Sequence, residues 1–172
     1  MFKTNRILVP VDFSKESELA LDWAGMLAQK EEDCTVFLFH VLPILPDPGA
    51  VGLGGLDYLE VEEDTTLAEL SRWQKKLPKG VMSSVSCEQG RVAEEVTKAC
   101  GTKMIDLIIM TTHGRKGLSH MLHGSAAEET VRLASCPVLV LHLNQTPPEA
   151  GHTQRPERMV SDLTEKYYLG RL

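Results

Sequence analysis

The segment between residues 111 and 127 combines glycine and hydroxyl residues at a spacing that suits the binding of an anion. Nine residues separate Gly114 from Gly124, and Ser125 follows the second glycine at the expected start of a helix. Glycine lets backbone N–H groups approach an anion closely, and the first turn of a helix adds partial positive charge. The Ser125 hydroxyl can donate to the same phosphate oxygen. The spacing therefore predicts a phosphate-binding loop.

The charge of this segment supports the same chemistry. Arg115 and Lys116 are cationic, and no acidic residue occurs between Thr111 and Ala127. Cationic side chains form charge-assisted hydrogen bonds with phosphate oxygens. The segment is not a P-loop, because the sequence contains no G-x-x-x-x-G-K-[ST]. Glycines at 52–55 lie in a long expected loop at 43–56 and are interpreted as a linker.

Histidines and serines of the same segment raise the questions of metal binding and of phosphoryl transfer. His113, His120 and His123 do not have the spacing of a tetrahedral metal set, so no metal site is expected. His113 and His123 are interpreted as polar groups near the phosphates. Ser119 and Ser125 carry the hydroxyls that could accept a phosphoryl group, which leaves autophosphorylation open.

The elements that must position this segment alternate along the chain. Short apolar runs predict strands at 7–11, 35–41, 82–88, 105–110 and 138–141. Helices are predicted at 14–30, 57–76, 91–101 and 124–134, with Gly101 closing the third. The apolar face of the first is predicted to consist of Leu19, Ala20, Trp23, Met26 and Leu27. Strands apolar on both faces indicate a covered parallel sheet. The fold class is therefore α/β, an open five-stranded parallel sheet with helices on both faces.

Ligands of such sheets bind at the carboxyl ends of the strands, where the direction of winding reverses. The loops after the first and fourth strands are therefore the candidates, which singles out Asp12 as well as the glycine segment. Asp12 can cap the first helix, as can Ser14, or contact a ligand; both roles are compatible. His40 is expected to close the second strand as a hydrogen-bonded residue. The fifth strand is expected at a sheet edge, which is a liability unless paired.

Composition limits the function classes. The chain has 172 residues and a net charge of −6, which does not suit a nucleic-acid binder. Residues 57–69 contain six acidic residues and no basic residue, which equals the net charge of the chain.

The sequence contains no signal-peptide core and no apolar stretch long enough to span a membrane, so a cytoplasmic protein that binds no membrane is expected. The four cysteines are spread singly and are expected to be reduced and mostly buried.

Two parts of the chain differ in character. Residues 1–144 form the expected domain, whereas residues 145–172 contain prolines at 147, 148 and 156 and predict a linker and tail. Residues 157–169 have weak amphipathic helical spacing. A partly ordered polar tail, or a helix docking on the domain or on a second subunit, remain alternative interpretations.

Four stretches of sequence resemble one known family. They are ILVPVDFS at 7–14, THGRKG at 112–117, LHGSAAE at 122–128 and CPVLV at 136–140. In this order they resemble the universal stress protein family over about residues 3–143. The resemblance implies a Rossmann-like fold of the adenine nucleotide alpha hydrolase-like type, and a homodimer through the last strand.

The resemblance also implies a ligand, ATP with or without Mg²⁺. ATP-binding members carry G-x-x-G, nine residues and then G-[S/T]; Gly114 matches the second glycine, but Thr111 replaces the first. Asp12 and the backbone near Val41 would lie against the adenine. The implied site residues are Pro10, Val11, Asp12, Val41, Met110, Thr111, His113, Gly114, Arg115, Lys116, Gly117, Gly124, Ser125 and Ala126.

Two functions remain open. The first is an ATP-binding regulatory module of the stress response, in which hydrolysis is slow or absent because nothing beside the phosphate loop is a general base. The second is a dimeric stress protein that binds no nucleotide and acts through protein contacts. Thr111 is the residue that discriminates between them, since a β-branched side chain stands where a backbone would approach ribose or phosphate.

Overall fold

The computed structural model describes residues 4–44, 55–111 and 126–141, with the side chains of residues 55–60 left out. Strands and helices alternate along these residues as predicted. The predicted phosphate loop at 112–125, most of the loop at 43–56 and the tail at 145–172 lie outside the described residues. The elements are β1 (Arg6–Pro10), α1 (Lys15–Ala28), β2 (Thr35–Leu42), α2 (Gly55–Gln74), β3 (Met82–Gln89), α3 (Val92–Thr102), β4 (Leu107–Thr111), α4 (Ala126–Leu133) and β5 (Val138–Leu141).

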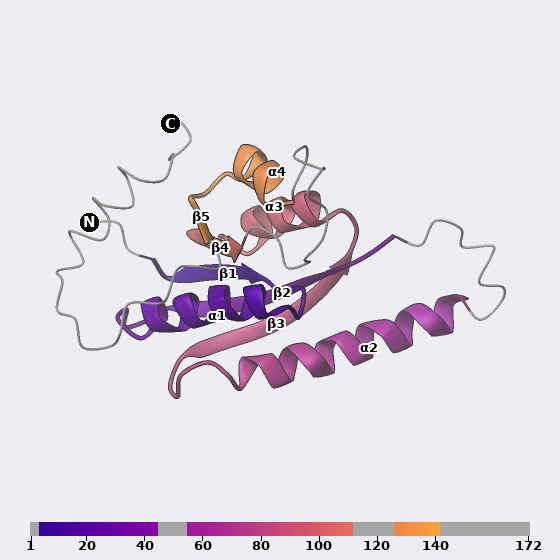
Figure 1. The fold of residues 1–172 in the computed structure, drawn as a ribbon, viewed down its shortest axis with the longest axis horizontal. Coiled ribbons are helices and arrows are strands. Elements are labelled where there is room, and N and C mark those ends of the chain that lie inside the picture. The colour runs from indigo at the N-terminus through magenta and orange to yellow at the C-terminus, as the bar shows by residue number, and fades with distance from the viewer. Residues whose placement is uncertain (1–3, 45–54, 112–125, 142–172) are drawn as a thin grey trace.

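The five described strands form one parallel sheet in the order β3-β2-β1-β4-β5 (Figure 1). β1 pairs with β2 along its whole length and with β4 at Ile7 and Leu8. The chain winds outward from β1 to β3 and then returns past β1 to β4 and β5, so the winding direction reverses between β1 and β4. β5 is an edge strand of this sheet. These findings confirm the predicted fold class and the predicted position of the last strand.

Helices cover both faces of the sheet, as Figure 1 shows: α1 and α2 lie on one side, α3 and α4 on the other. Alternate residues of β1 enter the two cores. Ile7 and Val9 pack with α1 and α2, whereas Leu8 packs with α3 and α4, and all three are fully buried. A central strand buried on both faces explains the unbroken apolar run in the sequence.

Helix α1 meets the sheet through small residues. Ala20, Ala24 and Ala28 are buried at intervals of one helical turn, which lets the helix axis approach the strands. The larger Leu19, Trp23 and Leu27, predicted on the apolar face, are half-buried at its margin. The predicted helix is confirmed. Of its predicted apolar face, Ala20 is buried in the core, and the larger side chains lie at the margin of the core.

The end of α3 differs from the prediction. Gly101 lies within the helix, and the left-handed residue is Met104, with φ of 50°. The Ile105 N–H donates to the Cys100 carbonyl at 2.9 Å and the Met104 N–H donates to the Gly101 carbonyl at 3.2 Å. These two hydrogen bonds form a Schellman motif, in which glycine is the usual left-handed residue. The prediction that Gly101 closes α3 was therefore wrong by three positions.

No helix among the described residues is both long enough and apolar enough to cross a membrane.

Candidate functional site

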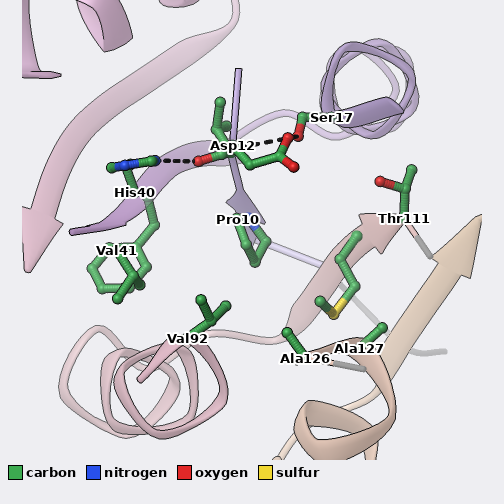
Figure 2. Close-up of a pocket in the computed structure, with 12 residues that line it drawn as sticks. Pro10, Asp12, Ser17, His40, Val41, Val92, Thr111, Ala126 and Ala127 are labelled. Atoms are coloured by element: carbon green, nitrogen blue, oxygen red, sulfur yellow. Dashed lines mark hydrogen bonds between the residues drawn. The ribbon is translucent and has the colours of Figure 1, made fainter. Parts of the chain in front are cut away.

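A pocket of about 280 Å³ opens at the carboxyl ends of β1, β2 and β4 (Figure 2). This is the crevice at which the winding direction reverses, where open parallel sheets bind ligands. The first residues of α3 and α4 complete its wall. Its lining residues are Pro10, Val11, Asp12, Ser17, Phe39, His40, Val41, Val92, Met110, Thr111, Ala126 and Ala127.

The pocket has an apolar interior and a few polar groups. Pro10, Val41, Val92 and Met110 contribute aliphatic surface from three strands and one helix. The polar side chains come from Asp12, Ser17, His40 and Thr111. Apolar walls with a small number of placed polar groups are typical of sites for small organic ligands.

The carboxylate of Asp12 is held by the first turn of α1. Its Oδ1 accepts from the Ser14 hydroxyl at 2.5 Å, from the Ser14 N–H at 3.0 Å and from the Ser17 hydroxyl. The Asp12 N–H in turn donates to Ser17 Oγ at 3.1 Å. Ser14 is the N-cap, since its Oγ accepts from the Ser17 N–H at 3.2 Å. Among the described residues, the hydrogen bonds that the Asp12 side chain accepts all end on Oδ1, so Oδ2 can accept from a ligand.

These hydrogen bonds also determine the ionisation of Asp12. Partial burial alone would raise the pKa of this carboxyl, but the donors from Ser14 and Ser17 outweigh it and lower the pKa below the ordinary value of 3.8. Asp12 is thus a carboxylate at neutral pH. A carboxylate accepts hydrogen bonds and cannot donate them, so the partner that it selects must carry an N–H or O–H group.

His40 and Phe13 support the loop that carries Asp12. His40 Nδ1 lies 2.6 Å from the Val11 carbonyl oxygen, which confirms that His40 is hydrogen-bonded. His40 does not close the second strand as predicted, because β2 continues to Leu42. The Phe13 ring packs on His40 with centroids 4.8 Å apart. Phe13 has φ of 61°, a left-handed conformation that is strained for a residue with a Cβ. The ring contacts hold it there.

A second ring contact connects this loop to α2. The Phe13 ring meets Trp73 of α2 edge-on at 5.7 Å. Lys76 Nζ lies 4.2 Å from the centre of the Trp73 ring and 3.0 Å from a carboxylate oxygen of Glu18. The loop after β1 is thereby braced between the end of β2 and the end of α2.

Half of the predicted site residues line this pocket. The structure brings together Pro10, Val11, Asp12, Val41, Met110, Thr111 and Ala126. Thr111 and Ala126, the described residues that flank the predicted phosphate loop in the sequence, both line the pocket. The remaining predicted residues, which lie outside the described part of the chain, are His113, Gly114, Arg115, Lys116, Gly117, Gly124 and Ser125.

Sequence reasoning did not assign five lining residues to the site: Ser17, Phe39, His40, Val92 and Ala127. For two of them, His40 and Ala127, the sequence contained a pattern that could have predicted a place in the site. His40 lies near the carboxyl end of an apolar strand, where ligands bind, and Ala127 lies two residues after Ser125. Ser17 and Val92 had none, because their position depends on how the helices approach the sheet.

An open parallel α/β sheet with helices on both faces and a pocket at its switch point places the chain among the Rossmann-like α/β proteins. The chain belongs to the universal stress protein family, whose model matches residues 3–142.

Relatives and solved structures agree with this assignment. Universal stress protein MJ0531 of Methanocaldococcus jannaschii is 32% identical over 138 residues, which cover 79% of this chain and 81% of the relative. The structure of MJ0577 from the same organism superposes with a TM-score of 0.68 at 26% identity, covering 85% of this chain and 99% of that one. A universal stress protein in complex with cAMP has a TM-score of 0.59 at 18% identity, covering 81% and 98%.

Proposed function

We propose that this protein is an ATP-binding regulatory module of the universal stress protein family, with slow or absent hydrolysis. The observation that carries the proposal is the pocket at the β1/β4 switch point, with the Asp12 carboxylate at its rim. Thr111 and Ala126, which flank the predicted phosphate loop, line the same pocket. The fold relative solved with cAMP supports an adenine nucleotide as the ligand.

The dimensions and polarity of the pocket suit the nucleoside part of ATP. A volume of about 280 Å³ lies just below the range of about 300–1,000 Å³ for small-molecule sites, so the described part of the pocket has room for a part of the ligand. The aliphatic side chains of Val41 and Met110 offer surface for a flat base, and Asp12 accepts from an amino or hydroxyl group of the base or sugar. In this proposal the phosphates extend toward the segment 112–125, where Arg115, Lys116 and Ser125 would bind them.

The alternative is a stress protein that binds no nucleotide and acts through protein contacts. It is favoured by one observation, that Thr111 lines the pocket in place of the glycine of the family motif. Thr111 is also the last described residue before the predicted phosphate loop. The substitution Thr111→Gly restores the motif and therefore measures how much the threonine restricts binding.

Native mass spectrometry of the protein purified from cells, followed by titration with Mg·ATP, tests the proposal. We expect bound adenine nucleotide or a rise in melting temperature at millimolar Mg·ATP, because a ligand that binds the folded state stabilises it. An empty protein whose melting temperature does not change with Mg·ATP would support the alternative. Saturable binding that Thr111→Gly strengthens would support the nucleotide site.

A matched pair of variants locates the binding. Asp12→Ala removes the acceptor at the pocket rim, whereas Asp33→Ala removes an exposed carboxylate from the turn before β2. We expect the first to weaken nucleotide affinity about tenfold or more and the second to leave it unchanged, since a hydrogen bond to a charged group contributes about 1.5–3 kcal/mol. Equal effects of the two variants would place the ligand elsewhere.

We further propose a homodimer that pairs through β5. The support is that β5 is an edge strand of the described sheet and consists of the apolar residues Val138–Leu141. Sedimentation velocity at micromolar concentrations measures the assembly. A monomer over the whole concentration range would contradict the dimer without affecting the proposed nucleotide site.

A further inference from the structure

Two cysteines that are distant in the sequence are in contact where α3 packs near the start of the edge strand β5. Cys100 lies in α3 and Cys136 lies two residues before β5, and their Sγ atoms are 2.7 Å apart. Cys100 belongs to the core formed with α3 and α4, and the partly buried Cys136 packs against that core. Both thiols are free. The contact brings together helix α3 and the segment that enters the edge strand.

The separation of the two sulfurs is close to that of a bond. A disulfide has an S–S length of about 2.05 Å, so the two atoms need to approach by only about 0.7 Å. The Cys100 sulfur also lies near two other groups: its thiol donates to the Ile105 carbonyl oxygen at 3.9 Å and accepts from the Ser135 hydroxyl at 3.7 Å. Cys34 and Cys87 have no such sulfur neighbour among the described residues, which makes them natural controls.

We propose that Cys100 and Cys136 form an intramolecular disulfide when the protein is exposed to a peroxide. Cys100 is 2% exposed, whereas Cys136 is half-buried, so the oxidant reaches Cys136 first. The Cys136 thiolate attacks one peroxide oxygen, the O–O bond breaks, and water and a sulfenic acid form. The Cys100 thiol then displaces hydroxide from that sulfenic acid to form the S–S bond and a second water. The two thiols lose two electrons, which the peroxide takes up.

The environment of the pair affects the rate of the first step. Burial, contact with Cys100 and the negative charge of Asp106 all raise the pKa of Cys136. Because the thiolate is the nucleophile, oxidation at neutral pH is expected to be slow and to accelerate as the pH rises. The second step needs no diffusion, since Cys100 is already in contact.

The bond would close the part of the chain that the proposed ligand site uses. Residues 100–136 contain β4, the predicted phosphate loop and the helix α4. Fixing both ends of this stretch reduces the freedom of the unfolded chain, so the oxidised protein is expected to melt roughly 5–15 °C above the reduced protein. This inference does not depend on nucleotide binding.

The experiment is treatment of the full chain with hydrogen peroxide at several pH values, followed by alkylation of free thiols and mass spectrometry. We expect the number of free thiols to fall from four to two. The intact mass should decrease by two hydrogen atoms, and reduction should reverse the change. Tryptic digestion without reduction should yield the peptide of residues 99–103 joined to the peptide of residues 133–158.

Single variants identify the partners. Cys136→Ser should abolish the thiol loss by disulfide formation and the rise in melting temperature, whereas Cys87→Ser, at another half-buried cysteine, should leave both intact. Four thiols that all remain reduced, or a linked peptide that contains Cys34 or Cys87, would overturn the proposal. The peptide map of the unsubstituted chain decides the question even where a variant fails to fold.

Discussion

The Nδ1 atom of His40 lies 2.6 Å from the carbonyl oxygen of Val11, and this hydrogen bond joins the end of β2 to the residue that follows β1. A carbonyl oxygen only accepts, so Nδ1 carries the hydrogen. The same two strands are also joined by the Val11 N–H, which donates to the Phe39 carbonyl at 2.8 Å. Both backbone groups of Val11 are therefore satisfied from β2, which fixes the pocket floor next to Asp12.

Replacement of His40 should separate its two contacts. His40→Phe keeps an aromatic ring beside Phe13 but leaves the Val11 carbonyl without its donor, and we expect a loss of about 1–3 kcal/mol in unfolding free energy. His40→Asn places an amide donor near the position of Nδ1 and loses the ring contact. Urea denaturation gives the unfolding free energies of the two variants and of the wild type, which are then compared. If His40→Phe were as stable as the wild type, the hydrogen bond would have no structural role.

Asp12 should contribute stability that depends on pH. Its pKa is lower in the folded protein than the ordinary 3.8, so the folded state favours the carboxylate. The contribution is complete above the ordinary value and is lost as the pH falls through the folded value. Asp12→Asn should therefore be less stable than the wild type at neutral pH, with the difference disappearing in strong acid. Melting temperatures of both proteins along a pH series measure it, and Asp33→Asn serves as the exposed control. A difference that grows in acid would contradict the assigned direction.

Phe13 offers a test of backbone strain. Phe13→Ala and Phe13→Gly both remove the ring that contacts His40 and Trp73, but only glycine adopts φ of 61° without steric cost. We expect both variants to be destabilised, with the glycine variant about 1 kcal/mol more stable than the alanine variant. Chemical denaturation gives the difference. Equal stabilities would mean that the left-handed conformation costs nothing.

Met104 is a site where the same argument predicts stabilisation. It is 68% exposed and left-handed at the end of α3, so its side chain contributes little packing. Met104→Gly should raise the unfolding free energy by about 1 kcal/mol, because glycine is the preferred residue of a Schellman motif. Met104→Ala keeps the backbone cost and should show no such gain. A loss of stability in the glycine variant would show that the methionine side chain matters.

The strands and helices could be predicted from the sequence because their patterns are local. The run of apolar residues in β1 indicates burial on both faces, and the alternation of elements then restricts the sheet to a parallel one. The error at Gly101 has a local cause as well. A glycine near a helix end is typical of the left-handed position, but Gly101 is helical and Met104 takes that conformation in its place.

The candidate site was predictable only in part. Asp12 and Thr111 follow from the rule that ligands bind at carboxyl strand ends, since that rule needs only the strand positions, whereas Met110 was expected only from the family resemblance. Ser17 and Val92 reach the pocket through the approach of α1 and α3 to the sheet, which spacing does not encode. The contact of Cys100 with Cys136 is similar: the residues are 36 positions apart, and only the packing of α3 against the start of β5 brings them together.

Because the Phe13 ring contacts Trp73 edge-on, the intrinsic fluorescence of Trp73 can report on the loop after β1. Trp73 is one of two tryptophans, the other being Trp23 on α1. Through Phe13 and His40, the Trp73 indole is two ring contacts away from the pocket. In a Trp23→Phe background its emission should therefore respond to any ligand that moves the loop after β1, so occupancy of the pocket can be followed without a labelled ligand.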